Sequence, residues 1–256
     1  MTEQTHEQTH EQTHEHTMER AVQPLLSARG ITAGYGKRRV LSGVDVHVAP
    51  GEVVGVLGHN GAGKTTLLKT LVRMVPLVSG EVEFLGERVE RLSSVTMVRR
   101  GMSITPAERP IFRDLTVAEN LELGASGISD KHEIKRRMAE VFEVFPVLAD
   151  RTTAIAGRFS GGQQRQLSLG IALMAHPRIM LLDEPSLGIS PAVVEATFRT
   201  IRDLAQTRSM SVLVVEQNVK AVTAVADRVY VLRNGAIVLE ETGAQAQQRE
   251  SWWDLF

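Results

Sequence analysis

VVGVLGHNGAGKTTLLKTL, residues 53–71, is the stretch that decides the fold of this 256-residue chain. Its first five residues form an apolar run typical of a buried strand, and the part from Lys64 onward favours a helix. Between them Gly58, Gly63, Lys64 and Thr65 match a glycine-rich loop whose backbone N–H groups surround a phosphate. A chance glycine-rich turn is the alternative, but the strand before the loop and the helix after it favour phosphate binding.

Seven residues of this loop and of the following helix are candidate nucleotide ligands: Asn60, Gly61, Ala62, Gly63, Lys64, Thr65 and Thr66. The lysine ammonium is expected to reach the β- and γ-phosphates, which makes Lys64 a candidate catalytic residue as well. The hydroxyl of Thr65 is expected to bind Mg²⁺. The positive end of the helix points at the same phosphates.

Apolar strand-like runs alternate with helical ones on both sides of this stretch. Residues 178–185 and 211–217 are continuous apolar runs of the kind buried on both faces of a sheet. The alternation favours an α/β fold with a mainly parallel central sheet. Between about 95 and 158, helix-compatible segments replace the strands and predict a helical lobe inserted in the core. Asn234-Gly235 is typical of a hairpin turn near the C-terminus.

The segment LLDEP, residues 181–185, places two carboxylates at the end of a buried strand. Asp183 suits a hold on Mg²⁺, and Glu184 suits the polarisation of an attacking water. The alternative is a carboxylate pair that caps the next helix. The phosphate loop upstream favours the first interpretation.

A second glycine-rich segment, FSGGQ at 159–163, offers hydroxyl, backbone and amide groups at the start of a helix, where anions bind. With these three motifs in this order, the sequence from about residue 26 to the end resembles the ATP-binding-cassette (ABC) ATPases, whose signature is LSGGQ. The resemblance implies that Ser160, Gly161, Gly162 and Gln163 close over a nucleotide held by a partner subunit. A linker without a ligand is the alternative.

The resemblance also implies the architecture of residues 25–256. They would form one ABC ATPase domain with a P-loop NTPase (RecA-like) α/β core, a β-subdomain and an inserted α-helical subdomain at about 95–158. Its cofactors would be ATP and Mg²⁺. Its partners would be a second ABC ATPase subunit paired head to tail, transmembrane permease subunits and, indirectly, a solute-binding protein. Such a subunit is cytoplasmic and peripheral on the inner face of the cell membrane.

Three positions outside these motifs bear on the chemistry. Tyr35 matches the aromatic residue that stacks on adenine in this family, with a strand-edge residue as the alternative. Gln217 stands where the family usually has a histidine, so it can position a γ-phosphate or a water but cannot carry a proton at neutral pH. The family's glutamine in the loop that enters the lobe aligns with Ala107, which cannot bind a metal. Whether Glu108 replaces that glutamine stays open.

The segments SLGISP (186–191) and VEQN (215–218) are similar to the second ATPase subunit of branched-chain amino-acid importers, and of related amide and urea importers. The sequence therefore predicts an ATPase subunit that energises such an importer. One alternative is a soluble non-transport ABC ATPase, which would need long coiled-coil insertions or a second ATPase domain. The other is a weakly hydrolysing regulatory subunit, which Ala107 and Gln217 favour and an intact Glu184 does not.

Composition excludes several other classes of protein. The formal net charge of −1 gives no electrostatic argument for nucleic acid as a partner, and the absence of cysteine excludes disulfides. Residues 1–20 begin with a Glu-Gln-Thr-His repeat, which predicts a disordered tail. Its histidines at spacing four leave a metal-binding interpretation open beside a low-complexity one. Trp252 and Trp253 could pack on the core or on a partner.

Overall fold

Buried parallel strands form the centre of the molecule, as the apolar runs predict. The computed structural model describes residues 23–108 and 110–255, so the predicted tail at 1–20 lies outside the described residues. β3 (Val53–Leu57), β7 (Ile179–Asp183) and β8 (Ser211–Glu216) are buried along their whole length. Their alternate residues pack into two hydrophobic clusters on opposite faces of the sheet.

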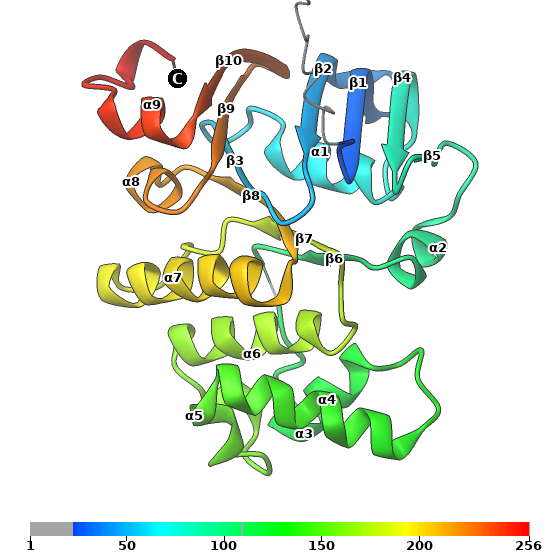
Figure 1. Ribbon diagram of the computed structural model, residues 1–256, viewed down its shortest axis with the longest axis vertical. Helices are drawn as coiled ribbons and strands as arrows, with labels where there is room; N and C mark the ends of the chain where they lie inside the picture. Colours follow the sequence, from blue (N-terminus) through cyan, green and yellow to red (C-terminus); the bar gives the residue numbers. More distant parts are fainter. Residues whose placement is uncertain (1–22, 109, 256) are drawn as a thin grey trace, which may run out of the picture.

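These strands belong to the larger of two sheets found in the described part of the chain (Figure 1). Its order is β10-β9-β3-β8-β7-β6, with β6 at Met102–Thr105, β9 at Arg228–Arg233 and β10 at Ala236–Thr242. All neighbours are parallel except β10, which is antiparallel to β9. The carboxyl ends of β3, β7 and β8 therefore share one edge, where ligands bind in open α/β sheets.

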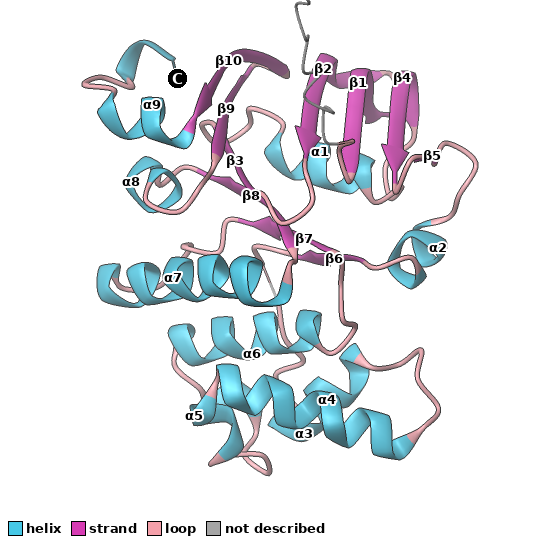
Figure 2. Cartoon of the chain, in the orientation of Figure 1, coloured by secondary structure: helices cyan, strands magenta, loops and turns pink. Residues whose placement is uncertain are grey.

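The smaller sheet is antiparallel and has the order β2-β1-β4-β5. Its strands are β1 (Leu26–Tyr35), β2 (Arg38–Val48), β4 (Leu77–Phe84) and β5 (Glu87–Arg88). Helix α1 (Lys64–Leu71) lies between the sheets and contacts strands of both (Figure 2). The helix predicted from Lys64 onward is thus confirmed, and it ends at Leu71, two residues before Arg73 adopts a left-handed φ of 65°.

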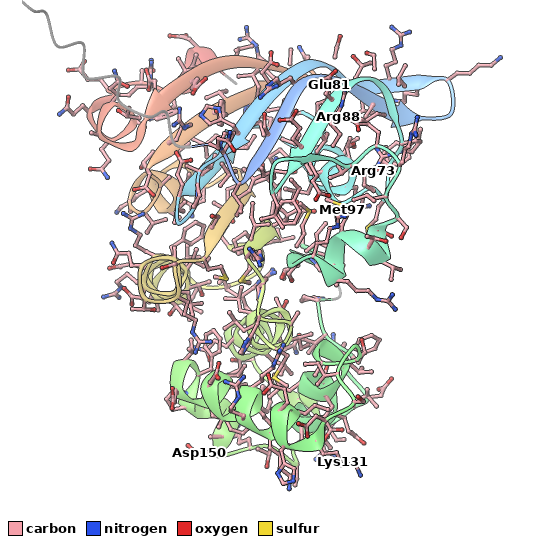
Figure 3. The ribbon with its side chains drawn as sticks, turned by 45° about the vertical axis from the view of Figure 1, so that its right-hand side comes forward. Arg73, Glu81, Arg88, Met97, Lys131 and Asp150 are labelled. Carbon is pink, nitrogen blue, oxygen red and sulfur yellow. The ribbon has the colours of Figure 1, made fainter. Side chains whose placement is uncertain are left out.

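A group of helices forms the end of the molecule opposite the smaller sheet (Figure 1). It contains α3 (Val117–Gly124), α4 (Lys131–Val144), α5 (Pro146–Ala149), the short 3₁₀ turn Ala156–Arg158 and α6 (Gly161–Leu173). Figure 3 shows Lys131 and Asp150 at this end, far from Glu81 and Arg88 of the smaller sheet.

The range predicted for the helical lobe, about 95–158, also contains a strand. After α2 (Ser94–Arg99), β6 returns to the larger sheet and pairs with β7. Its sequence, MSIT, alternates apolar and polar residues, but four residues are the shortest run in which such alternation indicates a strand. In the structure the lobe therefore begins after β6 rather than at residue 95.

The C-terminal part completes the larger sheet. α7 (Pro191–Arg208) and α8 (Val219–Thr223) flank β8 along the chain, and α9 (Gly243–Gln248) follows β10. The predicted hairpin is confirmed: Asn234 (φ 51°) and Gly235 (φ 80°) join β9 to β10 with the two positive φ angles of a type I′ turn. Trp252, just before the short 3₁₀ turn Trp253–Leu255, packs against the core, with the Arg249 guanidinium 5.6 Å from its ring centroid.

Candidate active site

The phosphate loop connects β3 to α1 and is shaped by glycine. Gly61 and Gly63 have φ angles of 84° and 111°, a region that other residues rarely adopt. A Cβ on Gly58 would lie 2.5 Å from the backbone oxygen of Leu232. The loop therefore approaches the neighbouring strand β9 at a distance that only glycine allows.

Lys64 is the first residue of α1, and its ammonium group lies inside this loop. It donates to the backbone oxygens of Gly58 (2.6 Å) and His59 (2.9 Å). The same nitrogen lies 3.0 Å from Oε1 of Glu184, and the lysine side chain is only 4% exposed. A buried cation this close to the loop backbone is well placed to compensate phosphate charge.

Thr65 and Asp183 bring two oxygen ligands together from the two predicted motifs. The Thr65 hydroxyl donates to Oδ2 of Asp183 at 2.9 Å. Burial raises the pKa of Asp183, the charge of Glu184 adds to this, and the Thr65 hydrogen bond opposes it. The other oxygen, Oδ1, is buried and has no hydrogen-bond partner among the described residues.

These oxygens fit Mg²⁺. The ion prefers one or two protein oxygens, with phosphates and water as its other ligands. In the described part of the chain no group of three or more His, Cys, Asp or Glu residues could hold a metal by itself. The unpartnered Oδ1 of Asp183 is the atom that such an ion would satisfy.

Glu184 and Gln217 lie together at the ends of two neighbouring strands. Nε2 of Gln217 donates to Oε1 of Glu184 (3.1 Å) and to Oδ1 of Asn60 in the phosphate loop (2.8 Å). Glu184 adopts a left-handed φ of 44°, and its N–H donates to the backbone oxygen of Val215 in β8. A non-glycine residue held in that conformation is typical of a functional site.

The FSGGQ segment forms the N-terminus of α6. The Ser160 hydroxyl accepts from the N–H of Gln163 (3.4 Å), and Oε1 of Gln163 accepts from the N–H of Ser160 (3.1 Å), which makes a capping box. A Cβ on Gly162 would lie 2.7 Å from the Val193 side chain, so glycine here allows α6 to pack closely on α7. Ser160 and Gly161 remain exposed.

The two glycine-rich segments do not meet within this chain. In the described residues no hydrogen bond or ion pair joins 159–163 to the loop at 58–65. Figure 1 shows α1 among the strands and α6 among the helices of the lobe. The exposed N-terminus of α6 is therefore available to a ligand held elsewhere.

Arg165, on α6, is a residue of the site that sequence reasoning missed. It is 4% exposed, and its guanidinium makes long contacts to the backbone oxygens of Pro106 (3.5 Å), Ala107 (3.4 Å) and Glu184 (3.4 Å). Burial lowers its pKa, and the charges of Glu216 and Asp183 oppose that shift. Its spacing of four from the buried Leu169 is the signal that places it on the inner face of the helix.

The remaining candidates lie at the margin of the site. Tyr35 is the last residue of β1 and is 49% exposed, a position that fits both base stacking and a strand edge. Ala107 follows β6, and its backbone oxygen accepts from Arg165. Glu108 beside it is exposed.

Comparison with known proteins identifies the family. The sequence profile described as ABC transporter matches residues 41–187, more than half of the chain. The chain belongs to the ABC transporter family. As a member of this family it is an ATPase that binds ATP, as the motifs predict.

Curated relatives of this ABC ATPase include transport subunits. The high-affinity branched-chain amino acid transport ATP-binding protein BraG of Pseudomonas aeruginosa is 42% identical over 220 residues, 86% of this chain and 94% of that protein. The probable branched-chain amino acid transport ATP-binding protein LivF of Archaeoglobus fulgidus is 32% identical, over 88% of this chain and 95% of that protein. The lipopolysaccharide export system ATP-binding protein LptB of Escherichia coli is 33% identical, over 88% and 93%.

Solved structures confirm the predicted fold class. An ATP-binding cassette of an ABC transporter superposes with a TM-score of 0.81 at 25% identity, over 88% of this chain and 94% of that one. A dimeric bacterial ABC transporter cassette superposes with a TM-score of 0.75 at 22% identity, over 85% and 98%. Within residues 23–108 and 110–255, every helix is too short or too polar to span a lipid bilayer.

Proposed function

We propose that this ABC ATPase energises an importer of branched-chain amino acids. Two of its relatives are named for branched-chain amino acid transport, and BraG is 42% identical across nearly its whole length. LptB, named for lipopolysaccharide export, is 33% identical. The higher identity of BraG, 42% against 33% for LptB, supports the amino-acid substrate class over lipid export, whereas LivF, at 32%, does not distinguish the two.

One observation carries the proposed hydrolysis: a carboxylate oxygen shared by two donors beside the phosphate loop. Oε1 of Glu184 lies 3.0 Å from the Lys64 ammonium and accepts from Gln217 at 3.1 Å. In our proposal Glu184 orients and polarises the attacking water. Lys64 stabilises charge on the transferred phosphate, and Gln217 holds the carboxylate in place.

The remaining contacts to the nucleotide follow from the loop. The N–H groups from Asn60 to Thr66 would surround the phosphates, and Tyr35 would stack on adenine. Thr65 and Asp183 would hold Mg²⁺. When bound, Mg²⁺ would neutralise charge on the β- and γ-phosphates.

We further propose that the exposed start of α6 completes the site of a partner. Ser160, Gly161, Gly162 and Gln163 would close over the γ-phosphate held by the loop of a second ABC ATPase subunit, of the same or another chain. The dimeric cassette among the structural relatives supports such pairing. The importer would also include transmembrane permease subunits and act with a solute-binding protein. This chain would lie on the cytoplasmic face of the membrane.

The geometry bears on the two alternative functions. A weakly hydrolysing regulatory subunit is not favoured, because Lys64, Glu184 and Gln217 are held together in one site. A soluble non-transport ATPase is not favoured either, because the curated relatives described above are transport or export subunits.

Uptake of labelled leucine tests the importer. Cells lacking this gene receive either the unmodified chain, Glu184→Gln or the exposed control Glu195→Gln. We expect uptake with the unmodified chain and with Glu195→Gln, but not with Glu184→Gln, while ATP binding to all three proteins is retained. Leucine uptake at full rate with Glu184→Gln would contradict the proposal. In that case the Glu184→Gln subunit would be purified from membranes in the presence of ATP, and the proteins that co-purify with it would be identified.

A further inference from the structure

One buried carboxylate beside the site takes part in no step described above. Glu216 is the last residue of β8 and is 1% exposed. A charged carboxylate is costly to bury unless its oxygens accept hydrogen bonds. Glu216 lies directly before Gln217 of the site, and its carboxylate accepts hydrogen bonds from the backbone nearby.

Both carboxylate oxygens accept backbone N–H groups, and each serves a different loop. Oε1 accepts from Ser186 at 2.7 Å, in the turn that follows Glu184. Oε2 accepts from Gln217 at 3.0 Å and from Asn218 at 3.3 Å, in the turn that follows β8. The two turns are thus tied to each other by one rigid group.

These two turns hold the two side chains that must meet for the proposed chemistry. Glu184 lies two residues before Ser186, and the side chain of Gln217 reaches back to Oε1 of Glu184 at 3.1 Å. A shift of either turn would lengthen that hydrogen bond. Arg165 also contacts the first of these turns, since its guanidinium lies 3.4 Å from the backbone oxygen of Glu184.

We propose that Glu216 is a positioning residue that sets the distance between Gln217 and Glu184. It acts by holding the backbone of both turns through its two oxygens. The proposal rests on the hydrolytic role of Glu184 given above, and it adds that the residue before Gln217 determines whether the Gln217–Glu184 hydrogen bond forms.

Glu216→Gln is the appropriate variant because it keeps the size of the side chain. Its amide retains one acceptor, so the NH₂ group faces the N–H donors of one of the two turns. We expect kcat for ATP hydrolysis to fall about tenfold while KM for ATP changes less than about twofold, because the Glu216 carboxylate accepts its hydrogen bonds from the two turns and not from the phosphate loop. Glu195→Gln, an exposed carboxylate on α7, is the matched control and should leave both values unchanged.

A double variant separates positioning from a general structural effect. If Glu216 acts through Gln217, adding Glu216→Gln to Gln217→Ala should lower kcat by less than about threefold further, since the positioned group is already gone. A full tenfold loss in that background would overturn the proposal. So would a wild-type kcat for Glu216→Gln alone.

A measurement on the unmodified chain covers the case in which Glu216→Gln does not fold. NMR-detected hydrogen exchange of Ser186, Gln217 and Asn218 should show protection of all three amides with one common opening rate. Rapid exchange of the Ser186 amide, with protection of the Gln217 and Asn218 amides, would show that Glu216 does not hold the two turns together and would overturn the proposal. Glu184→Gln, assayed in parallel, keeps the two claims distinct: wild-type hydrolysis by that variant would contradict the proposed function, whatever Glu216→Gln does.

Discussion

At the scale of single residues, the site is organised around one oxygen of Glu184. The ammonium of Lys64 and the amide of Gln217 both point at Oε1. The amide differs from a histidine in one respect that matters, because it donates a hydrogen bond at every pH and never becomes a cation. Hydrolysis by this chain should therefore have no titration that originates at position 217.

Gln217→His should introduce such a titration. A neutral imidazole can donate to Glu184, but a protonated one would form an ion pair that ties up the carboxylate. The ratio of the variant rate to the wild-type rate should therefore fall as the pH drops through about 6.5. Steady-state hydrolysis between pH 5.5 and 8 measures this, with Gln248→His on the exposed end of α9 as the control. A ratio that is constant with pH would show that residue 217 does not interact with the base.

Which of these residues could be predicted depends on how local their pattern is. Lys64, Thr65, Asp183 and Glu184 lie in short motifs and can be found from sequence alone. The hydrogen bond from Gln217 to Asn60 joins residues 157 positions apart, so only the parallel pairing of β3 with β8 brings them together. The same holds for the contact of Glu216 with Ser186, since a glutamate at the end of a strand has no distinctive local signal.

At the scale of elements, the β9–β10 hairpin supports the phosphate loop through its turn. The N–H of Gly235 donates to the backbone oxygen of Ala62 at 2.9 Å, and its backbone oxygen accepts from Ser42 at 2.8 Å. A Cβ on Gly235 would lie 2.0 Å from the backbone oxygen of Val40. The turn is thus wedged between the loop and β2, and no side chain fits there.

Gly235→Ala should therefore weaken ATP binding as well as stability. Gly86 has a similar φ, 75° against 80°, but a Cβ there would meet nothing within 4 Å, so Gly86→Ala is the matched control. The control should cost about 1–2 kcal/mol of unfolding free energy from its left-handed backbone alone. Gly235→Ala should cost more and raise the Kd for ATP, as measured by urea unfolding and by titration with a fluorescent ATP analogue. Equal Kd values for the two variants would show that the turn at Gly235 does not support the phosphate loop.

The α4 helix is joined to the core by a network centred on Glu140. Its carboxylate accepts from Arg136 on the same helix, lies 3.3 Å from Arg208 of α7 and lies 2.9 Å from Nε2 of His176, which follows α6. Burial lowers the pKa of His176, the charge of Arg137 adds to this, and Glu140 opposes it. The folded structure therefore favours the neutral form of this histidine.

This network predicts a loss of stability in mild acid. With the pKa of His176 lowered in the folded state, the unfolded chain binds a proton more readily than the folded chain as the pH falls through about 6.5, so stability falls in that direction. Glu133, whose pKa is lowered to about 2, stays charged over this range. Urea unfolding at pH 7.5 and 5.5 should show a smaller loss for His176→Gln than for the unmodified chain, with His132→Gln as the exposed control. An equal loss in both would exclude this histidine as the cause.

Local structure explains where the prediction of elements succeeded. The strand at 53–57 and the interior of the strand at 211–216 are continuously apolar, and the Asn234-Gly235 turn has the residues that its φ angles require. β6 was missed because its alternating pattern spans only four residues and lies between segments that favour helices; its pairing with β7 makes it a strand. Nothing in the sequence marks the left-handed conformation of Arg73, which follows the end of α1.

At the scale of the whole molecule, the chain separates the two helix starts that we propose bind phosphate. α1 begins at Lys64 among the strands, and α6 begins after Ser160 in the lobe (Figure 1). In the described residues nothing connects the exposed start of α6 to the loop at 58–65 by a hydrogen bond or an ion pair. If both bind one nucleotide, as we propose, two subunits must be present.

Ser160→Asp tests that requirement without disturbing the helix. Aspartate is as good an N-cap as serine, so α6 should keep its start, while the added negative charge repels the γ-phosphate of a partner's ATP. In the Glu184→Gln background, size-exclusion chromatography should show an ATP-dependent dimer that Ser160→Asp abolishes. ATP should still bind to the phosphate loop of the resulting monomer, because that loop is unchanged.

Ser93→Asp, the same exchange at the exposed N-cap of α2, is the control and should leave the dimer intact. Persistence of the dimer in Ser160→Asp would mean that the FSGGQ segment does not contact the nucleotide of the partner subunit. Loss of ATP binding by the monomer would instead place that segment in the nucleotide site of its own chain.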